Sequence, residues 1–261
     1  MIYCVNHRTW RHFGGALASQ FELRYKMLVD AQYWDVGRFQ GMEYDSYDTP
    51  AATYLVWLDK DGVARGSVRT VPTDRSYMLK DLWPNIVEKI PLPQSLSVWE
   101  ATRFCVDSSL PKDVRRQIKH ELVCAFLEFG LKNDVREMIG VMPPKLWKSC
   151  FIEAGWDIEF LGPEKQVEGG DIIVAGLMPI SLAVLQKVRA TTGIAGPVLL
   201  TAREAGDDQE RDRAGADPQR EHDLVAGYSD PAATPTAGLP GPGRLVEVND
   251  DNADNATSRA A

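Results

Sequence analysis

The chain has 261 residues, of which 44% are hydrophobic and 25% are charged, and its formal net charge is −8. This composition is typical of a globular protein with enough apolar residues for one large core. No apolar run approaches the roughly 20 residues that span a bilayer, and the N-terminus turns polar too early for a secretory signal, so we expect a cytoplasmic protein without a membrane partner.

Periodicity and turn signals divide the first 200 residues into alternating elements. In chain order we predict a helix at 17–30, an irregular acidic stretch to about residue 50, a hairpin of strands at 53–58 and 63–71, a short helix at 78–88 and a strand at 97–106. A long helix at 112–132, a strand at 137–142, a helix at 144–154, strands at 157–161 and 171–177 and a helix at 181–189 follow. This order predicts an α/β domain with one mixed sheet flanked by helices.

The composition changes after residue 200. Residues 201–261 hold 13 acids and 6 bases among Pro, Gly, Ala and Asn, so they carry most of the net negative charge. Such a segment buries too little apolar surface to offset its ordering entropy. We therefore predict a domain at 1–200 and a disordered acidic Pro/Gly/Ala-rich tail at 201–261. The nearly neutral domain shows no basic stripe with interleaved aromatics, which excludes a typical nucleic-acid binder.

Three acids, Glu43, Asp45 and Asp48, lie just before the apolar strand at 53–58. Acids beside a buried strand require partners, and two arginines are suitably placed. Arg24 falls inside the apolar stripe of the helix at 17–30, and Arg69 lies on the half-polar face of the strand at 63–71. We expect these side chains to meet in or near the core.

The strand SVWEATRFCV adds a second acid–arginine pair, Glu100 and Arg103, to a run that otherwise reads as interior. Side chains three apart on a regular strand point to opposite faces, so joint action in one pocket requires a bulge. A structural ion-pair network that clamps the N-terminal segment is one interpretation. Because burying ions costs several kcal/mol each, we favour a site for a zwitterionic small molecule that carries an ammonium or sulfonium group and a carboxylate.

The four cysteines are widely spaced and form no C-x-x-C pair, and the four histidines belong to no cluster. We therefore predict no metal site and no histidine base.

The charged residues fall in motifs that resemble those of a known family. The motifs are E-x-D-x-x-D from Glu43 to Asp48, then YLVW, G-x-x-R-T-x-P-T at 66–73, MLKDLWP, W-E-x-T-R-F at 99–104 and EAGW. In this order, over about 190 residues, they resemble the acyl-homoserine lactone synthases of the LuxI type, the autoinducer synthase family. Leu28 and Trp83 depart from the family pattern, where phenylalanine is common at both positions.

The resemblance implies a fold similar to the N-acetyltransferases, with a mostly antiparallel sheet. It also implies an acyltransferase that makes a quorum-sensing signal. The amine of S-adenosylmethionine, a substrate here and not a cofactor, attacks an acyl thioester of acyl carrier protein or of CoA. The carboxylate then closes the lactone and displaces methylthioadenosine. The resemblance implies no metal.

With this chemistry the residues receive expected roles. Glu100 is the first candidate for the base and Glu43 the second, since a free amine with a pKa of about 8 needs only a modest base. The expected substrate-binding residues are Arg24, Trp34, Asp45, Asp48, Arg69 and Arg103. The acyl chain is expected to lie against Trp99, Phe104, Met142, Trp147 and Trp156. An acidic carrier protein would dock on the bases Arg115, Arg116, Lys119, Lys145 and Lys148.

Two other functions stay open. One is an N-acyltransferase that uses acyl-CoA on another amine, although the junction CVDSSLPKDVRR lacks the glycines of a standard CoA cradle. The other is a non-catalytic signal-binding regulator that uses its acidic tail for interactions.

Overall fold

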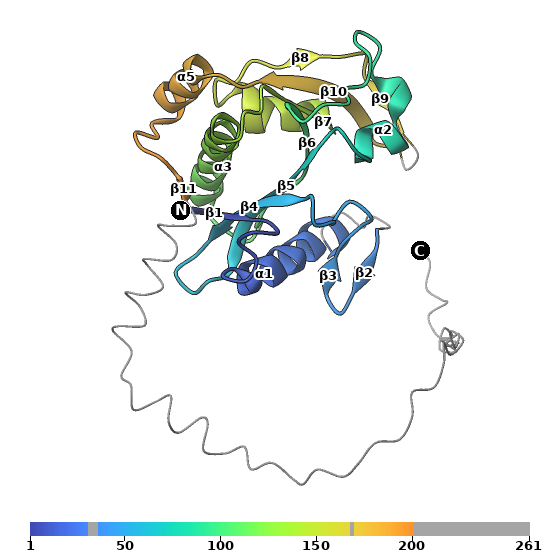
Figure 1. Cartoon of the computed structure of the whole chain (residues 1–261). Helices are drawn as coiled ribbons and strands as arrows, with labels where there is room; N and C mark the ends of the chain where they lie inside the picture. The colour runs from blue at the N-terminus through green and yellow to red at the C-terminus, as the bar shows by residue number, and fades with distance from the viewer. Residues whose placement is uncertain (31–35, 168–169, 201–261) are drawn as a thin grey trace, which may run out of the picture. The chain divides into compact units, whose positions relative to one another are not determined.

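A computed structural model describes residues 1–30, 36–167 and 170–200, and one large sheet organises them (Figure 1). Neighbouring strands are antiparallel except for the parallel pairs β1–β11 and β6–β7, which confirms the predicted mixed, mostly antiparallel sheet. The strand order is β11 (Leu199–Leu200), β1 (Ile2–Val5), β4 (Thr53–Leu58), β5 (Ala64–Pro72), β6 (Val98–Val106), β7 (Glu137–Met142), β10 (Ile172–Pro179) and β8 (Glu159–Phe160), and β9 (Lys165–Gln166) pairs with β10.

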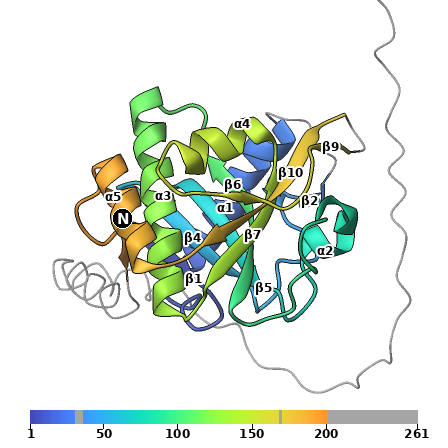
Figure 2. The same ribbon diagram turned by 90° about the horizontal axis from the view of Figure 1, so that it is seen from above.

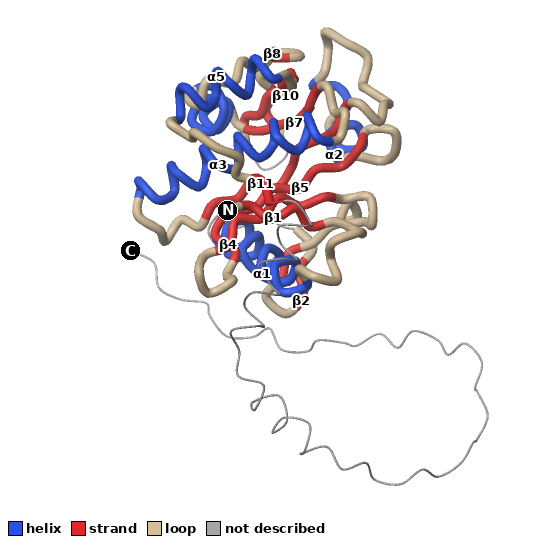
Figure 3. The backbone as a smooth tube through the Cα atoms, turned by 60° about the vertical axis from the view of Figure 1, so that its left-hand side comes forward, coloured by secondary structure: helices blue, strands red, loops and turns tan. Residues whose placement is uncertain are grey.

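Helices cover both faces of this sheet, as Figures 1 and 3 show. One face carries α1 (Gly14–Arg24), its π-helical continuation Tyr25–Asp30 and the small hairpin of β2 (Arg38–Phe39) and β3 (Met42–Glu43). The opposite face carries α3 (Lys112–Lys132), α5 (Leu182–Thr192), and α4 (Pro144–Leu146) with its π-helical continuation Trp147–Ile152 (Figure 2). Each face has its own apolar cluster. We call the two sides the α1 face and the α3 face.

Amphipathic patterning explains the long helix. Ile118, Leu122 and Phe126 recur at every fourth position of α3, are fully buried, and pack on the sheet. The helix leaves room only for a glycine in β5, because a Cβ at Gly66 would lie 2.5 Å from Ile118 Cγ2. None of the helices in the described residues is long and apolar enough to cross a membrane.

The sequence predictions were wrong at some element bounds. The helix predicted at 78–88 is only α2 (Met78–Leu82) followed by a 3-10 turn at Pro84–Ile86, because a proline disfavours helical conformation in the residue before it. The terminal strands β1 and β11 were not predicted, since each is short and pairs only with distant sequence.

A bulge in β6 determines where its side chains point. Between Ser67 and Arg69 on β5 the chain advances two residues, while β6 advances three, from Cys105 to Thr102. Arg103 occupies the extra position with a φ of 57°, a conformation that non-glycine residues adopt rarely. The bulge turns Arg103 toward the α1 face, so the bulge that joint action with Glu100 required is present.

The strands β6 and β7 separate soon after they begin. They pair in parallel only where Val98, Trp99 and Glu100 face Glu137, Met138 and Ile139, although both strands continue. No residue of β6 beyond Glu100 pairs with β7, and we call the region between these unpaired continuations, residues 101–106 and 140–142, the slot.

Candidate active site

The innermost ion pairs of the α1 face belong to Arg24. Its Nε donates to Glu43, and its two terminal nitrogens donate to Asp48 Oδ1 and Oδ2 at 2.8 and 2.9 Å. The Arg24 and Glu43 side chains are fully buried. Asp48 also accepts hydrogen bonds from the Tyr54 hydroxyl and the Asp45 amide, both at 2.8 Å. The Asp48 carboxyl is partly desolvated, but its bonds to Arg24 and the charge of Arg69 hold its pKa well below the ordinary value of 3.8.

The outer ion pairs meet at Asp45. Arg69 NH2 donates to Asp45 Oδ2 at 3.0 Å, and Arg103 NH2 donates to the same oxygen at 2.7 Å. Arg103 Nε also donates to Glu43 Oε1 at 3.1 Å, which joins the outer pairs to the inner ones. Asp45 is 16% exposed and Arg103 is 9% exposed, so this side of the group is the more open one. Three arginines and three acids thus form one charged cluster, consisting of Arg24, Glu43, Asp45, Asp48, Arg69 and Arg103.

Glu100 lies beside this cluster and has no guanidinium partner among the described residues. Its two oxygens accept the backbone amides of Met78 and Leu79, at 2.9 and 2.6 Å, at the start of α2. Burial raises the pKa of the Glu100 carboxyl to about 7, against the opposing effect of these two hydrogen bonds and of Arg69. A carboxylate that titrates near neutrality is suited to accept a proton from an amine.

The sequence prediction missed several side chains at this site, among them Tyr47, Asp81 and Thr102. The Tyr47 hydroxyl donates to Asp81 at 3.2 Å, and the Tyr47 ring lies over the Arg69 guanidinium at 5.7 Å. Burial, and after it the charge of Asp81, raises the pKa of Tyr47 to about 12. Thr102 accepts a bond from Arg69 Nε at 3.0 Å. Tyr47 lies inside the E-x-D-x-x-D motif and Thr102 beside Arg103, so proximity to the motifs was the available signal.

The aromatic residues predicted for the acyl chain lie on the α3 face. Four rings follow one another from β6 toward β8: Phe104 contacts Phe151 with centroids 5.4 Å apart, Phe151 contacts Trp147 at 5.5 Å, and Trp147 contacts Phe160 at 6.3 Å. We call these four the aromatic row. The other predicted residues lie beside it: Trp99 packs on Phe129, Met142 pairs with Val174 across the sheet, and Trp156 packs on Phe151.

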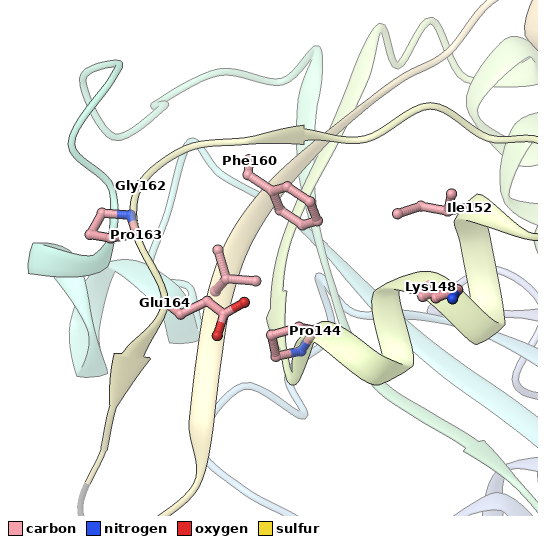
Figure 4. A pocket seen from close by; sticks show the side chains of 8 residues that line it. Pro144, Lys148, Ile152, Phe160, Gly162, Pro163 and Glu164 are labelled. Carbon is pink, nitrogen blue, oxygen red and sulfur yellow. The ribbon is translucent and has the colours of Figure 1, made fainter.

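A pocket opens at the far end of this row (Figure 4). It measures about 540 Å³ and lies where α4 and its continuation approach β8 and β10. We call it the outer pocket; it is lined by Pro144, Lys148, Ile152, Phe160, Gly162, Pro163, Glu164 and Val174. None of the residues predicted for the acyl chain lines it, so their assignment stays a prediction.

The predicted docking bases come from two neighbouring elements, α3 and the segment 144–152. Arg116, Lys145 and Lys148 are exposed, and Arg115 and Lys119 are partly buried. Lys119 Nζ donates to the Ser149 carbonyl at 3.3 Å, which joins the two elements. The bases therefore share one region of the surface.

Two predictions concern residues outside the described part of the chain, namely Trp34 and the tail at 201–261, and both stay predictions. Within the described residues, no group of three or more histidine, cysteine or acidic side chains is arranged to hold a metal ion.

Known proteins resemble this chain in sequence. The sequence model of the autoinducer synthase family matches residues 14–188. The acyl-homoserine-lactone synthase of Aeromonas salmonicida is 27% identical over 161 residues, which cover 60% of this chain and 76% of that protein.

Solved structures resemble it as well. The CoA-dependent acyl-homoserine lactone synthase BjaI, solved with MTA, matches with a TM-score of 0.69 and 25% identity over 77% of this chain and 92% of that chain. The CoA-dependent synthase MesI matches with a TM-score of 0.64 and 26% identity over 76% of this chain and 98% of that chain.

Proposed function

The chain belongs to the autoinducer synthase family, and on that premise we propose that its charged cluster binds S-adenosylmethionine while Glu100 accepts the proton of the substrate amine. The protein is an acyltransferase that makes an acyl-homoserine lactone, a quorum-sensing signal. The observation that carries the division of roles is the environment of Glu100: it is buried, and backbone amides bind its oxygens, whereas arginines bind the three acids of the charged cluster.

Charge balance supports the binding of S-adenosylmethionine. The charges of the three arginines and three acids in the charged cluster cancel, so ionised Glu100 adds a net negative charge beside them. S-adenosylmethionine carries an ammonium, a sulfonium and a carboxylate, a net charge of +1. Arg103 and Asp45, on the more open side, are suited to contact the carboxylate and the cationic groups, while Arg24 and Glu43 position them from the interior.

The acylation step uses the raised pKa of Glu100. Glu100, directly or through water, takes one proton from the substrate ammonium. The freed amine nitrogen bonds to the thioester carbonyl carbon, the C–S bond breaks, and the departing sulfur takes a second proton from the nitrogen and leaves as the thiol. Glu43 is the poorer base because both of its oxygens are bound by arginines. In the second step the substrate carboxylate bonds to the carbon attached to the sulfonium. That C–S bond breaks, the lactone closes, and methylthioadenosine leaves.

The slot between β6 and β7 is the proposed place of the acyl thioester. The pairing of β6 with β7 ends at Glu100, which brings the slot next to the proposed base. Both CoA-dependent synthases reported above match this fold, and the basic region on α3 and segment 144–152 suits an acidic carrier protein. We propose that the acyl donor is a thioester of carrier protein or of CoA, and the test compares these two donors. We also propose that the reaction takes place in the cytoplasm.

Product analysis tests this function. Purified protein is incubated with S-adenosylmethionine and acyl thioesters of carrier protein or of CoA, and the products are identified by mass spectrometry. We expect methylthioadenosine and an acyl-homoserine lactone in equal amounts with at least one donor. Acylation of a different amine without release of methylthioadenosine would instead support the N-acyltransferase alternative. Absence of both products with both donors contradicts the proposal.

A further inference from the structure

Two glycines lie side by side on neighbouring strands, β7 and β10, beneath the helices of the α3 face. Gly140 of β7 pairs directly with Gly176 of β10, and the indole of Trp147 covers this bare patch of backbone. A Cβ at Gly176 would lie 2.8 Å from Trp147 Cζ2, and one at Gly140 would lie 3.7 Å from Trp147 Cη2. The missing side chain of Gly176 therefore makes room for the indole, whereas Gly140 lets the Ala101 carbonyl approach closely.

The indole is fixed in this position. Trp147 is fully buried, and its Nε1 donates to the Val174 carbonyl at 2.9 Å. Phe151 and Phe160 both contact the indole, with ring centroids 5.5 and 6.3 Å away. A buried ring with a satisfied N–H and packed neighbours is a rigid wall.

This wall separates two spaces. On one side, Gly140 is the first residue of β7 beyond the last pair with β6, and a Cβ there would lie 3.0 Å from the Ala101 carbonyl oxygen, at the narrow end of the slot. On the other side, Phe160 and Val174, which both contact Trp147, line the outer pocket (Figure 4). Trp147 therefore contacts both the narrow end of the slot and the lining of the outer pocket.

We propose that Trp147 is the end wall of the acyl site and sets the maximum length of the acyl chain that the enzyme transfers. This inference rests on the proposed function and adds the residue that determines chain-length specificity. The terminal methyl group of the preferred chain lies against the indole. A longer acyl chain cannot extend past the indole, because the indole closes the way from the slot to the outer pocket.

The size of the effect follows from the energetics of apolar pockets. One methylene too many in a closed pocket reduces kcat/KM by about 10- to 200-fold. Removing the indole joins the slot to the outer pocket, and each further methylene that becomes buried then improves binding by roughly fourfold. The acyl-length preference should move toward longer chains, with a loss for the original chain, which no longer fills the enlarged space.

The test compares wild type with Trp147→Ala on a series of saturated acyl thioesters that differ by two carbons, with the rate of methylthioadenosine release as the readout. We expect the optimum to move at least two carbons longer in Trp147→Ala. Trp147→Met, which keeps apolar bulk in an unbranched side chain, serves if the alanine variant does not fold, and its optimum should move in the same direction by less. An unchanged optimum in a folded variant overturns the inference.

Control variants use the outer pocket itself. Ile152→Ala enlarges only the outer pocket and should leave the wild-type optimum unchanged, because the indole still closes the slot. In the Trp147→Ala background, Ile152→Trp should return the optimum toward shorter chains. An optimum that moves with Ile152→Ala alone contradicts the separation of the two spaces.

A binding measurement separates this inference from the proposed function. Non-reactive S-alkyl thioether analogues of increasing length raise the melting temperature when they fill the slot. The longest analogue that still stabilises the protein should be longer for Trp147→Ala than for wild type. If wild type makes no lactone but this length difference appears, the proposed function fails and the end wall stands; equal length limits overturn the end wall even in an active enzyme.

Discussion

The two faces of the sheet carry different kinds of side chain. The α1 face buries six charged side chains that neutralise one another and leave Glu100 beside them, whereas the α3 face presents a row of rings with no charge among them. Removing one partner of a buried ion pair leaves the other charge uncompensated, so single substitutions and changes of pH on the α1 face should lower stability strongly. Packing among uncharged rings depends on their shape and volume, so the aromatic row should respond to changes of size and not to pH.

The largest effect on stability is expected at Arg24. Arg24→Ala leaves the buried carboxylates of Glu43 and Asp48 without their inner partner. Breaking a buried ion pair on one side costs about 3–5 kcal/mol, which is roughly 6–20 °C in melting temperature for a domain of this size. The change in melting temperature is measured by circular dichroism during thermal unfolding.

The matched control is Arg75→Ala. Arg75 forms an ion pair with Asp74, and the Arg75 side chain is 50% exposed. An exposed pair contributes about 0–1 kcal/mol. If the two arginine variants lost equal stability, burial would not be what distinguishes the charged cluster.

A smaller, pH-dependent effect is expected at Asp48. Its pKa in the folded protein lies below the ordinary value of 3.8, so its stabilising contribution is complete above about pH 4 and is lost as the pH falls further into the acid range. Asp48→Asn removes a charged acceptor and should cost roughly 1.5–3 kcal/mol at pH 7. The difference from wild type should shrink between pH 4 and pH 2.

Urea unfolding at a series of pH values checks this, with Phe151→Leu on the α3 face as the comparison. Phe151 is buried among rings, so its loss should cost the same free energy at every pH. A constant difference for Asp48→Asn, or a pH-dependent one for Phe151→Leu, would break the contrast between the faces.

The smallest effect concerns the exposed bases. Arg116→Glu should raise the KM for a carrier-protein thioester several-fold at low salt and leave the KM for a CoA thioester nearly unchanged, because it alters only long-range attraction to an acidic partner. The difference should vanish as salt is added. Equal effects on both donors would place Arg116 at the thioester and not at the carrier surface.

Much of the charged cluster could be predicted from sequence, because charged residues inside apolar patterns require partners. Arg24 inside a helix stripe and Arg103 inside a buried strand are such signals, and the need for a bulge followed from the spacing of Glu100 and Arg103. The pairing within the cluster could not be predicted, since it depends on a hairpin, β2–β3, that brings Glu43 under α1.

Other features depend on tertiary contacts that leave no local pattern. The strands β1 and β11 are formed by residues about 200 positions apart. The end wall depends on Gly140 and Gly176 pairing across two strands, and each glycine alone reads as an ordinary strand residue. The backbone amides of Met78 and Leu79 that bind Glu100 carry no side-chain signal at all.

The most direct test of the account is the pH dependence of kcat/KM in wild type and Glu100→Gln. We expect the wild-type value to rise with an apparent pKa near 7, the pKa that burial gives Glu100. Loss of a positioned base should lower the rate about 10²–10⁴-fold, and the remaining rise should move to about 8, where the substrate amine itself loses its proton. A folded Glu100→Gln variant that keeps both the wild-type rate and the rise near 7 would contradict Glu100 as the base.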